Sequence, residues 1–222
     1  MTTSPNLHSE RSGHGTGPVV VASHGVGSDT GVWSTLTPVL AAGHVVVAWD
    51  QPGHGRSGSV GADEYGPGLA YASLCRIADP EVPVILLGHS LGGYLSCRYA
   101  IDFPDRVKAL ILIATGPGFR SPDAREKWNT DVRRGAQKQN RPETLVGLHE
   151  DSRVMDHLVE ITCPTLVMVG DGDAAFLGAT DYIERRIPGS ERITIPDAGH
   201  MVPATHGEIL GALIDEFLKR KL

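Results

Sequence analysis

The sequence contains no long apolar run, and no stretch approaches the ~18 residues that a membrane-spanning helix needs. Residues 1–18 also lack the basic region followed by an apolar region that marks a secretory signal. We therefore expect a cytoplasmic protein that does not insert into a membrane.

The sequence also contains few cysteines and fewer basic than acidic residues. The cysteines are Cys75, Cys97 and Cys163, which are scattered without a CxxC spacing, so we expect reduced thiols and no zinc site. The 20 Lys and Arg residues are outnumbered by 26 Asp and Glu residues, which gives a net charge of −6. Nucleic-acid binding needs a basic field, so we expect no nucleic-acid partner.

The sequence does contain short β-branched runs that alternate with longer amphipathic stretches. The runs predict six buried strands, at residues 19–22, 45–49, 84–87, 109–114, 165–169 and 192–195. Helices are expected at roughly 32–42, 65–78, 91–102, 176–186 and 206–220. This alternation indicates an α/β fold, with a mostly parallel sheet and helices on both faces.

One connection is far longer than a crossover needs, because about 50 residues separate the fourth and fifth strand runs. We expect residues 1–115 and 161–222 to form the core of one domain, and residues 116–160 to form a short helical lid.

The predicted lid has its own helix signals. Ser121 fits the cap of a helix and Pro122 its first turn. The apolar stripe of this helix is expected at Ala124, Trp128, Val132 and Ala136. The basic side chains of the lid either attract an acidic substrate or, as we favour, form a solvated face; they are Arg120, Arg125, Lys127, Arg133, Arg134, Lys138 and Arg141.

The stretch VILLGHSLGG, residues 84–93, places Ser90 between a strand-like run and a helix-like stretch and matches the pattern G-x-S-x-G. A residue at so tight a turn is held in a strained backbone conformation, and Gly88 and Gly92 let the strand and the helix close on each other. The hydroxyl would then be exposed next to a helix N-terminus, which stabilises negative charge. An ordinary turn with a capping serine is the alternative, but the flanking elements favour a nucleophile.

A serine nucleophile needs a base, and the base needs an acid that orients it. His200 is the candidate base, because IPDAGHMVP places it in a loop between the last strand and the last helix. The loop VMVGDGDAAF offers Asp171 and Asp173 as the acid. We favour Asp173, since Asp171 directly follows Gly170 and suits a turn. Asp197 also suits a turn, because it lies only three residues before His200.

Five motifs in this order are shared with one family: SHGVGS at 23–28, DQPGHGRS at 50–57, GHSLGG at 88–93, GDGD at 170–173 and DAGH at 197–200. From residue 19 to the end, the chain resembles the α/β-hydrolase fold family. The resemblance implies that Ser90 is the nucleophile, His200 the general base and then acid, and Asp173 the orienting acid, without a cofactor or metal. Family members begin with a β-hairpin, but residues 1–18 leave room for about one short strand, around residues 7–11.

The same resemblance implies an oxyanion hole made by the backbone N–H groups of Val26 and Leu91. A glycine-bearing loop after the first predicted strand can point such amides at the nucleophile. We expect Gly25, Trp128 and Met201 to contact the substrate, with Trp128 either touching it or only anchoring the lid.

Together these residues predict a serine hydrolase that cleaves a small or medium carboxylic ester, lactone or thioester through an acyl-enzyme. Its partner would be a small-molecule substrate, and the protein a monomer or homodimer. The sequence TGPG at 115–118 resembles ring-cleavage-product hydrolases, so hydrolysis of a carbon–carbon bond next to a ketone is one alternative. A receptor on the same fold that binds its ligand without turnover is another.

Overall fold

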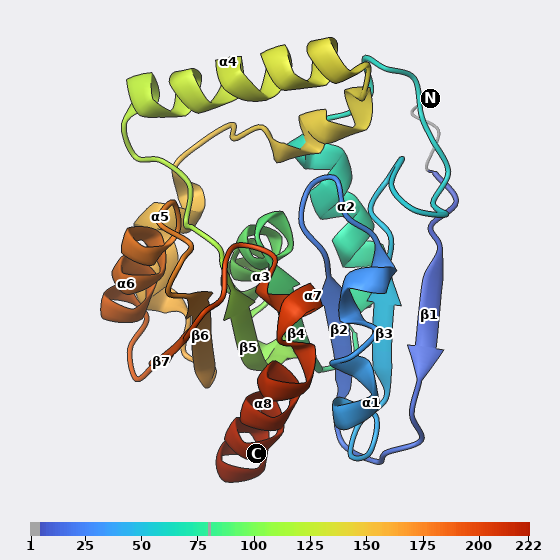
Figure 1. Cartoon of the computed structure of the whole chain (residues 1–222), viewed down its shortest axis with the longest axis vertical. Helices are drawn as coiled ribbons and strands as arrows, with labels where there is room; N and C mark the ends of the chain where they lie inside the picture. Colours follow the sequence, from blue (N-terminus) through green and yellow to red (C-terminus); the bar gives the residue numbers. More distant parts are fainter. Residues whose placement is uncertain (1–4, 80) are drawn as a thin grey trace.

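The computed structural model describes residues 5–79 and 81–222, and a seven-stranded sheet forms its centre (Figure 1). The strands are β1 (Ser9–Ser12), β2 (Val19–Ser23), β3 (Val46–Trp49), β4 (Val84–His89), β5 (Val107–Ile113), β6 (Thr165–Gly170) and β7 (Glu191–Ile195). They lie in the order β1-β3-β2-β4-β5-β6-β7, and every neighbouring pair is parallel except β1 with β3. The mostly parallel sheet and all six predicted strands are confirmed.

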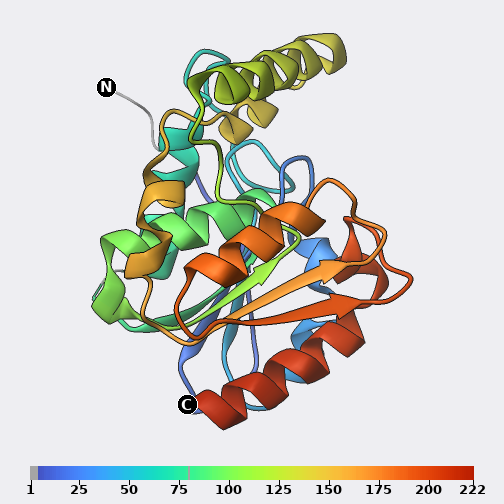
Figure 2. The ribbon, with the colours of Figure 1, turned by 90° about the vertical axis from the view of Figure 1, so that its left-hand side faces the viewer.

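Helices cover both faces of this sheet. The α-helices are α1 (Thr37–Leu40), α2 (Pro67–Ala78), α3 (Leu91–Asp102), α4 (Pro122–Gln139), α5 (Arg153–His157), α6 (Leu177–Arg186), α7 (Val202–Thr205) and α8 (Gly207–Lys221), and the 3-10 helices are η1 (Thr30–Trp33), η2 (Pro104–Arg106), η3 (Pro142–Gly147) and η4 (Leu158–Glu160). Neighbouring strand residues face opposite ways: Leu86 packs in a core with α2, α3 and α6, and Ile85 in a core with α1 and α8. Figure 2 shows α6 and α8 on opposite sides of β6 and β7.

Two details near the N-terminus refine the sequence-based expectations. One short strand does precede β2, but it lies at Ser9–Ser12 and pairs antiparallel with β3. The single helix predicted over 32–42 is wrong, because η1 and α1 are separate there. Pro38 lies in the first turn of α1, where its missing N–H is tolerated, whereas a continuous helix would place it in the interior.

The carboxyl ends of the parallel strands meet at one edge of the sheet, and α4 lies across that edge (Figure 1). The loops after β2, β4, β6 and β7 all emerge there. The predicted lid segment is divided between two places. Its later part packs in the core, where Val154 and Leu158 are fully buried in the same apolar cluster as Tyr99, whereas α4 is largely exposed.

A helix that spans a membrane must be both long and predominantly apolar. Among the described residues, no helix is both long enough and apolar enough to cross a bilayer.

Candidate active site

The turn between β4 and α3 holds Ser90 in a backbone conformation that side-chain-bearing residues rarely adopt, with φ 52° and ψ −118°. The flanking glycines make this turn possible. A β-carbon on Gly88 would lie 2.4 Å from the backbone of Gly92, and one on Gly92 would lie 2.0 Å from the carbonyl oxygen of Ser23. The close approach of β2, β4 and α3 therefore requires glycine at both positions.

The loops after β6 and β7 bring an acid and a base to this serine. His200 Nε2 lies 3.2 Å from Ser90 Oγ, and His200 Nδ1 lies 2.8 Å from Asp173 Oδ2. The Asp173 side chain is 4% exposed, whereas Asp171 is exposed and accepts a hydrogen bond from the backbone N–H of Ala198 at 3.3 Å. Asp173, and not Asp171, thus faces the histidine, and its carboxylate favours the tautomer with the proton on Nδ1.

The position of His200 is supported by two neighbours that were not expected from the sequence. His89 Nε2 donates a hydrogen bond to the backbone carbonyl of His200 at 2.8 Å. Phe176 stacks on the imidazole with ring centroids 4.6 Å apart. Burial lowers the pKa of His89 to about 4, with a further contribution from His200, so His89 is a neutral donor near pH 7. Its place beside Ser90 in the motif was the available sequence signal.

The loop after β2 is tied down beside Ser90. His24 Nε2 accepts the backbone N–H of Gln51 at 3.0 Å, so the proton lies on Nδ1, which donates to the carbonyl of Gly25 at 2.7 Å. Burial lowers the pKa of His24 to about 4, which keeps this tautomer neutral. A β-carbon on Gly25 would lie 2.9 Å from Ser90 Cβ. The loop therefore approaches the serine as closely as its backbone allows.

The two amides predicted for the oxyanion hole flank Ser90. Leu91 is the first residue of α3, directly after the serine, and Val26 follows Gly25 in the loop just described. Within residues 5–79 and 81–222, neither amide donates a hydrogen bond to a protein acceptor. Neither amide is thus committed to a described protein acceptor.

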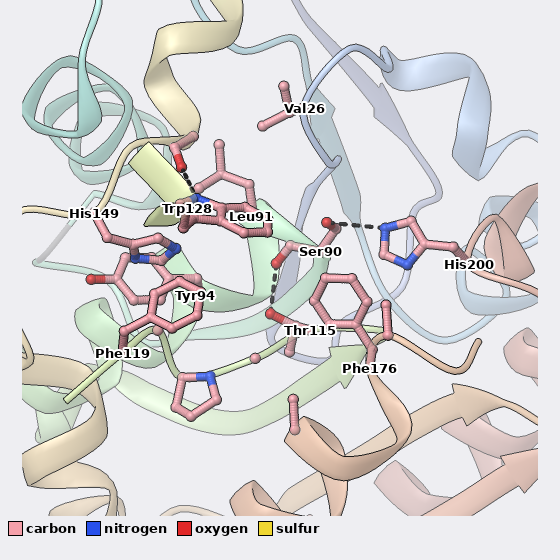
Figure 3. Close-up of a pocket in the computed structure, with 16 residues that line it drawn as sticks. Val26, Ser90, Leu91, Tyr94, Thr115, Phe119, Trp128, His149, Phe176 and His200 are labelled. Carbon is pink, nitrogen blue, oxygen red and sulfur yellow. Dashed lines mark hydrogen bonds between the residues drawn. The ribbon is translucent and has the colours of Figure 1, made fainter. Parts of the chain in front are cut away.

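A cavity of about 470 Å³ opens over Ser90 and His200 (Figure 3). Its lining is mostly apolar and aromatic: Val26, Ser90, Leu91, Tyr94, Thr115, Gly116, Pro117, Gly118, Phe119, Trp128, Gly147, His149, Ala175, Phe176, Ala179 and His200. Trp128 lines the cavity as expected for a substrate contact. Gly25 and Met201 do not: neither lines the cavity, and Met201 is 43% exposed.

Most of the wall opposite His200 comes from the predicted lid segment. The apolar stripe predicted for its helix, α4, is wrong at one position. Ser121 and Pro122 begin α4 as expected, but Ala124 is exposed and Asn129 is buried instead. The Asn129 side chain accounts for its own burial, because it makes two hydrogen bonds to the backbone of His149.

Trp128 both anchors this segment and faces the cavity. Its Nε1 donates to the carbonyl of Gly147 at 2.9 Å, and its ring lies 5.6 Å from that of Phe119. The sequence-based alternatives of contact and anchoring are therefore compatible.

The basic side chains of this segment are largely paired. Five of the seven form ion pairs with neighbouring carboxylates, namely Arg120, Lys127, Arg133, Arg134 and Arg141. Such exposed pairs favour a solvated face over an acidic-substrate site.

Comparison with known proteins agrees with this fold. Residues 18–143 match the family model described as alpha/beta hydrolase fold. The pimeloyl-(acyl-carrier protein) methyl ester esterase of Klebsiella pneumoniae is 36% identical over 121 residues, which span 54% of this chain and 45% of that protein. This match therefore covers less than half of that relative.

Two other matches extend over almost the entire chain. The enzyme of the same name from Vibrio parahaemolyticus is 28% identical over 96% of this chain and 98% of its own. A thermophilic esterase from Thermogutta terrifontis, solved with malate bound, has a TM-score of 0.80 and 26% identity over 96% of this chain and 93% of its own. The family match and the seven-stranded architecture lead to one conclusion: the chain belongs to the alpha/beta hydrolase fold family.

Proposed function

We propose that this protein is a serine hydrolase that cleaves a small or medium carboxylic ester, lactone or thioester through an acyl-enzyme. The observation that carries the proposal is the hydrogen-bonded chain from Ser90 through His200 to buried Asp173, at 3.2 and 2.8 Å, at the base of the cavity. The esterase names of the relatives support an ester as the substrate class.

Each residue has a distinct role in this reaction. His200 Nε2 takes the proton of Ser90 as its Oγ attacks the carbonyl carbon, and Asp173 holds the imidazole and stabilises the imidazolium that forms. The N–H groups of Val26 and Leu91 stabilise the oxygen that becomes negative, each worth about 10²- to 10³-fold in rate. His200 then protonates the leaving group. Water, activated by the same histidine, hydrolyses the acyl-enzyme.

The cavity limits what can be cleaved. A volume of about 470 Å³ with an apolar, aromatic wall suits an acyl group of small to medium size. Trp128 and Gly147 of the predicted lid segment line the cavity, and Trp128 Nε1 donates a hydrogen bond to the carbonyl of Gly147. Substrate size therefore depends on where α4 and η3 are held.

A labelling experiment with a turnover assay tests the proposal. The wild-type protein should react with a fluorophosphonate probe and should hydrolyse a short-chain p-nitrophenyl ester, and Ser90→Ala should abolish both. Ser121→Ala is the matched control, because it removes an exposed serine hydroxyl outside the cavity and should leave labelling intact. Absence of labelling, or turnover unaffected by Ser90→Ala, would overturn the serine mechanism.

The two alternatives give different outcomes in the same assays. Labelling followed by a single-turnover burst would indicate a receptor that binds without turnover. Hydrolysis of a carbon–carbon bond next to a ketone, with esters left uncleaved, would assign the other reaction.

A further inference from the structure

The wall of the cavity opposite His200 contains a second histidine that the proposed reaction does not use. Figure 3 shows the His149 ring across Ser90 from His200, among the aromatic side chains. Its ring centroid lies 4.4 Å from that of Tyr94, at an interplanar angle of 89°, and 5.4 Å from that of Phe119, at 86°. His149 is thus a polar group inside an aromatic wall.

The position of His149 is firmly held. Asn129 Nδ2 donates to the carbonyl of His149 at 2.8 Å, and the backbone N–H of His149 donates to Asn129 Oδ1 at 2.9 Å. Both residues are buried, with 8% of His149 exposed. Because a buried asparagine uses both ends of its amide on this one residue, the loop has little freedom to move the imidazole away from the cavity.

The imidazole itself has no protein partner. Nδ1 is enclosed without a hydrogen bond, next to Gly118, where a β-carbon would lie 3.2 Å from it. In the part of the chain that the structure describes, Nε2 also makes no hydrogen bond to protein, and it is not among the enclosed atoms. An enclosed N–H left unpaired is rarer than an unpaired acceptor, so the proton belongs on Nε2.

The charge of His149 and the hydrogen bonds of its polar neighbours limit the role that His149 can have. Burial lowers the pKa of His149 to about 4, with opposing contributions from Asp151 and Arg125, so the ring is neutral near pH 7. Two other polar groups of the wall are already engaged: Thr115 Oγ1 donates to the carbonyl of Ser90 at 2.6 Å, and Trp128 Nε1 is bonded as described. The Tyr94 hydroxyl points away from Ser90 (Figure 3). His149 Nε2 is therefore a donor in this wall that no described protein group uses.

We propose that His149 is a specificity-determining residue whose Nε2–H donates a hydrogen bond to a neutral acceptor oxygen, such as a ketone, hydroxyl or ether, on the part of the substrate that fills the cavity. This inference rests on the proposed function, because it describes the substrate of the same site. A neutral donor surrounded by aromatic rings suits an uncharged oxygen better than a carboxylate, whose charge it would leave uncompensated. The remaining methylene groups of the substrate would pack against the aromatic rings.

Paired substrates test this assignment. We would compare p-nitrophenyl octanoate with its 4-, 5-, 6- and 7-oxo derivatives in the wild type, in His149→Phe and in His149→Gln. For at least one oxo position, the ratio of kcat/KM between the oxo ester and the plain ester should fall by about three- to tenfold in His149→Phe, the value of one neutral hydrogen bond. His149→Gln, which keeps an N–H donor, should restore part of that ratio.

A matched control separates loss of the donor from loss of any histidine. His157→Phe changes a half-exposed histidine on α5, outside the cavity, and should leave all ratios unchanged. If the ratios in the wild type and in His149→Phe agree at every oxo position while the plain ester is cleaved, the inference is wrong and the proposed function stands. If no ester is cleaved at all, the proposed function is wrong.

A spectroscopic readout does not depend on turnover or on the folding of His149→Phe. Long-range ¹H–¹⁵N correlation of the ¹⁵N-histidine-labelled wild type should show His149 as the neutral Nε2–H tautomer. In Ser90→Ala, the matching oxo ester should shift the His149 Nε2 signal more than plain octanoate does. An Nδ1–H tautomer, or equal shifts with both esters, would overturn the inference.

Discussion

Three buried histidines should make the stability of this protein fall steeply in mild acid. Burial lowers the pKa of His24, His89 and His149 from 6.5 to about 4 in each case. Below pH 6.5 these side chains bind a proton in the unfolded chain, but in the folded protein they stay neutral until about pH 4. The free energy of unfolding is therefore at its full value above pH 6.5 and is lost as the pH falls toward 4.

The size of the loss follows from proton linkage. Between pH 7.5 and 5.5, a group with an unfolded pKa of 6.5 that stays neutral when folded costs about 1.4 kcal/mol. Three such groups cost about 4 kcal/mol, and His54, whose pKa burial also lowers, adds to the loss. Since a domain is stable by about 5–15 kcal/mol, this is a large share. Carboxylates with lowered pKa, such as Glu191 at about 2, act only at lower pH.

Urea unfolding at pH 7.5 and 5.5, followed by the fluorescence of buried Trp33 and Trp49, measures this loss. His149→Phe removes one titrating group, so its loss should be smaller than that of the wild type by about 1.4 kcal/mol. Phe119→Leu changes the same wall without a titrating group and should leave the pH-dependent part unchanged. A wild-type loss below about 1 kcal/mol, or an equal loss in His149→Phe, would refute the reasoning.

Two further pairs of substitutions test the site and the fold. Asp173→Asn should lower kcat on an activated ester by about 10³- to 10⁴-fold, whereas Asp171→Asn, which alters an exposed loop contact, should lower it by less than about tenfold; equal losses would contradict the assignment of the acid. Gly92→Ala places a β-carbon 2.0 Å from a carbonyl oxygen of β2 and should lower the free energy of unfolding by about 1–3 kcal/mol or more. Gly135→Ala, in open space on α4, should raise it by about 0.5–1 kcal/mol. Urea unfolding measures both, and a well-tolerated Gly92→Ala would show that strand and helix are not in close contact.

Most of the fold could be predicted because its signals are local. Each parallel strand is a short β-branched run whose sheet position follows from alternation with helices, and both faces of β4 are buried as its uninterrupted apolar letters indicate. That Ser90, Asp173 and His200 lie close together could likewise be predicted from strand-end loops, because parallel strands bring such loops to one edge. The helix error over 32–42 arose from a local signal given too little weight, since Pro38 marks the start of α1.

The missed residues depend on contacts that no local pattern contains. Asn129 is polar and appears on a helix whose apolar stripe was expected elsewhere, and it is buried only because the backbone of His149 is there to satisfy it. His89 follows a glycine in a strand, and its role comes from a carbonyl 111 residues away. In both cases the role of the side chain depends on a hydrogen-bond partner that is distant in the sequence, so the sequence pattern could not reveal that role.

These buried polar groups also link the stability of the protein to its chemistry. His24 holds the loop that contains Val26, and His89 holds the loop that contains His200. His149 lines the cavity. The neutral histidines that destabilise the fold in acid are therefore also those around Ser90. Protonating any of these histidines would place a positive charge in a buried site. It would also convert the ring nitrogen that has no proton into a hydrogen-bond donor, which changes the hydrogen bonds that the ring can make. Loss of activity in mild acid should therefore accompany loss of structure around the site.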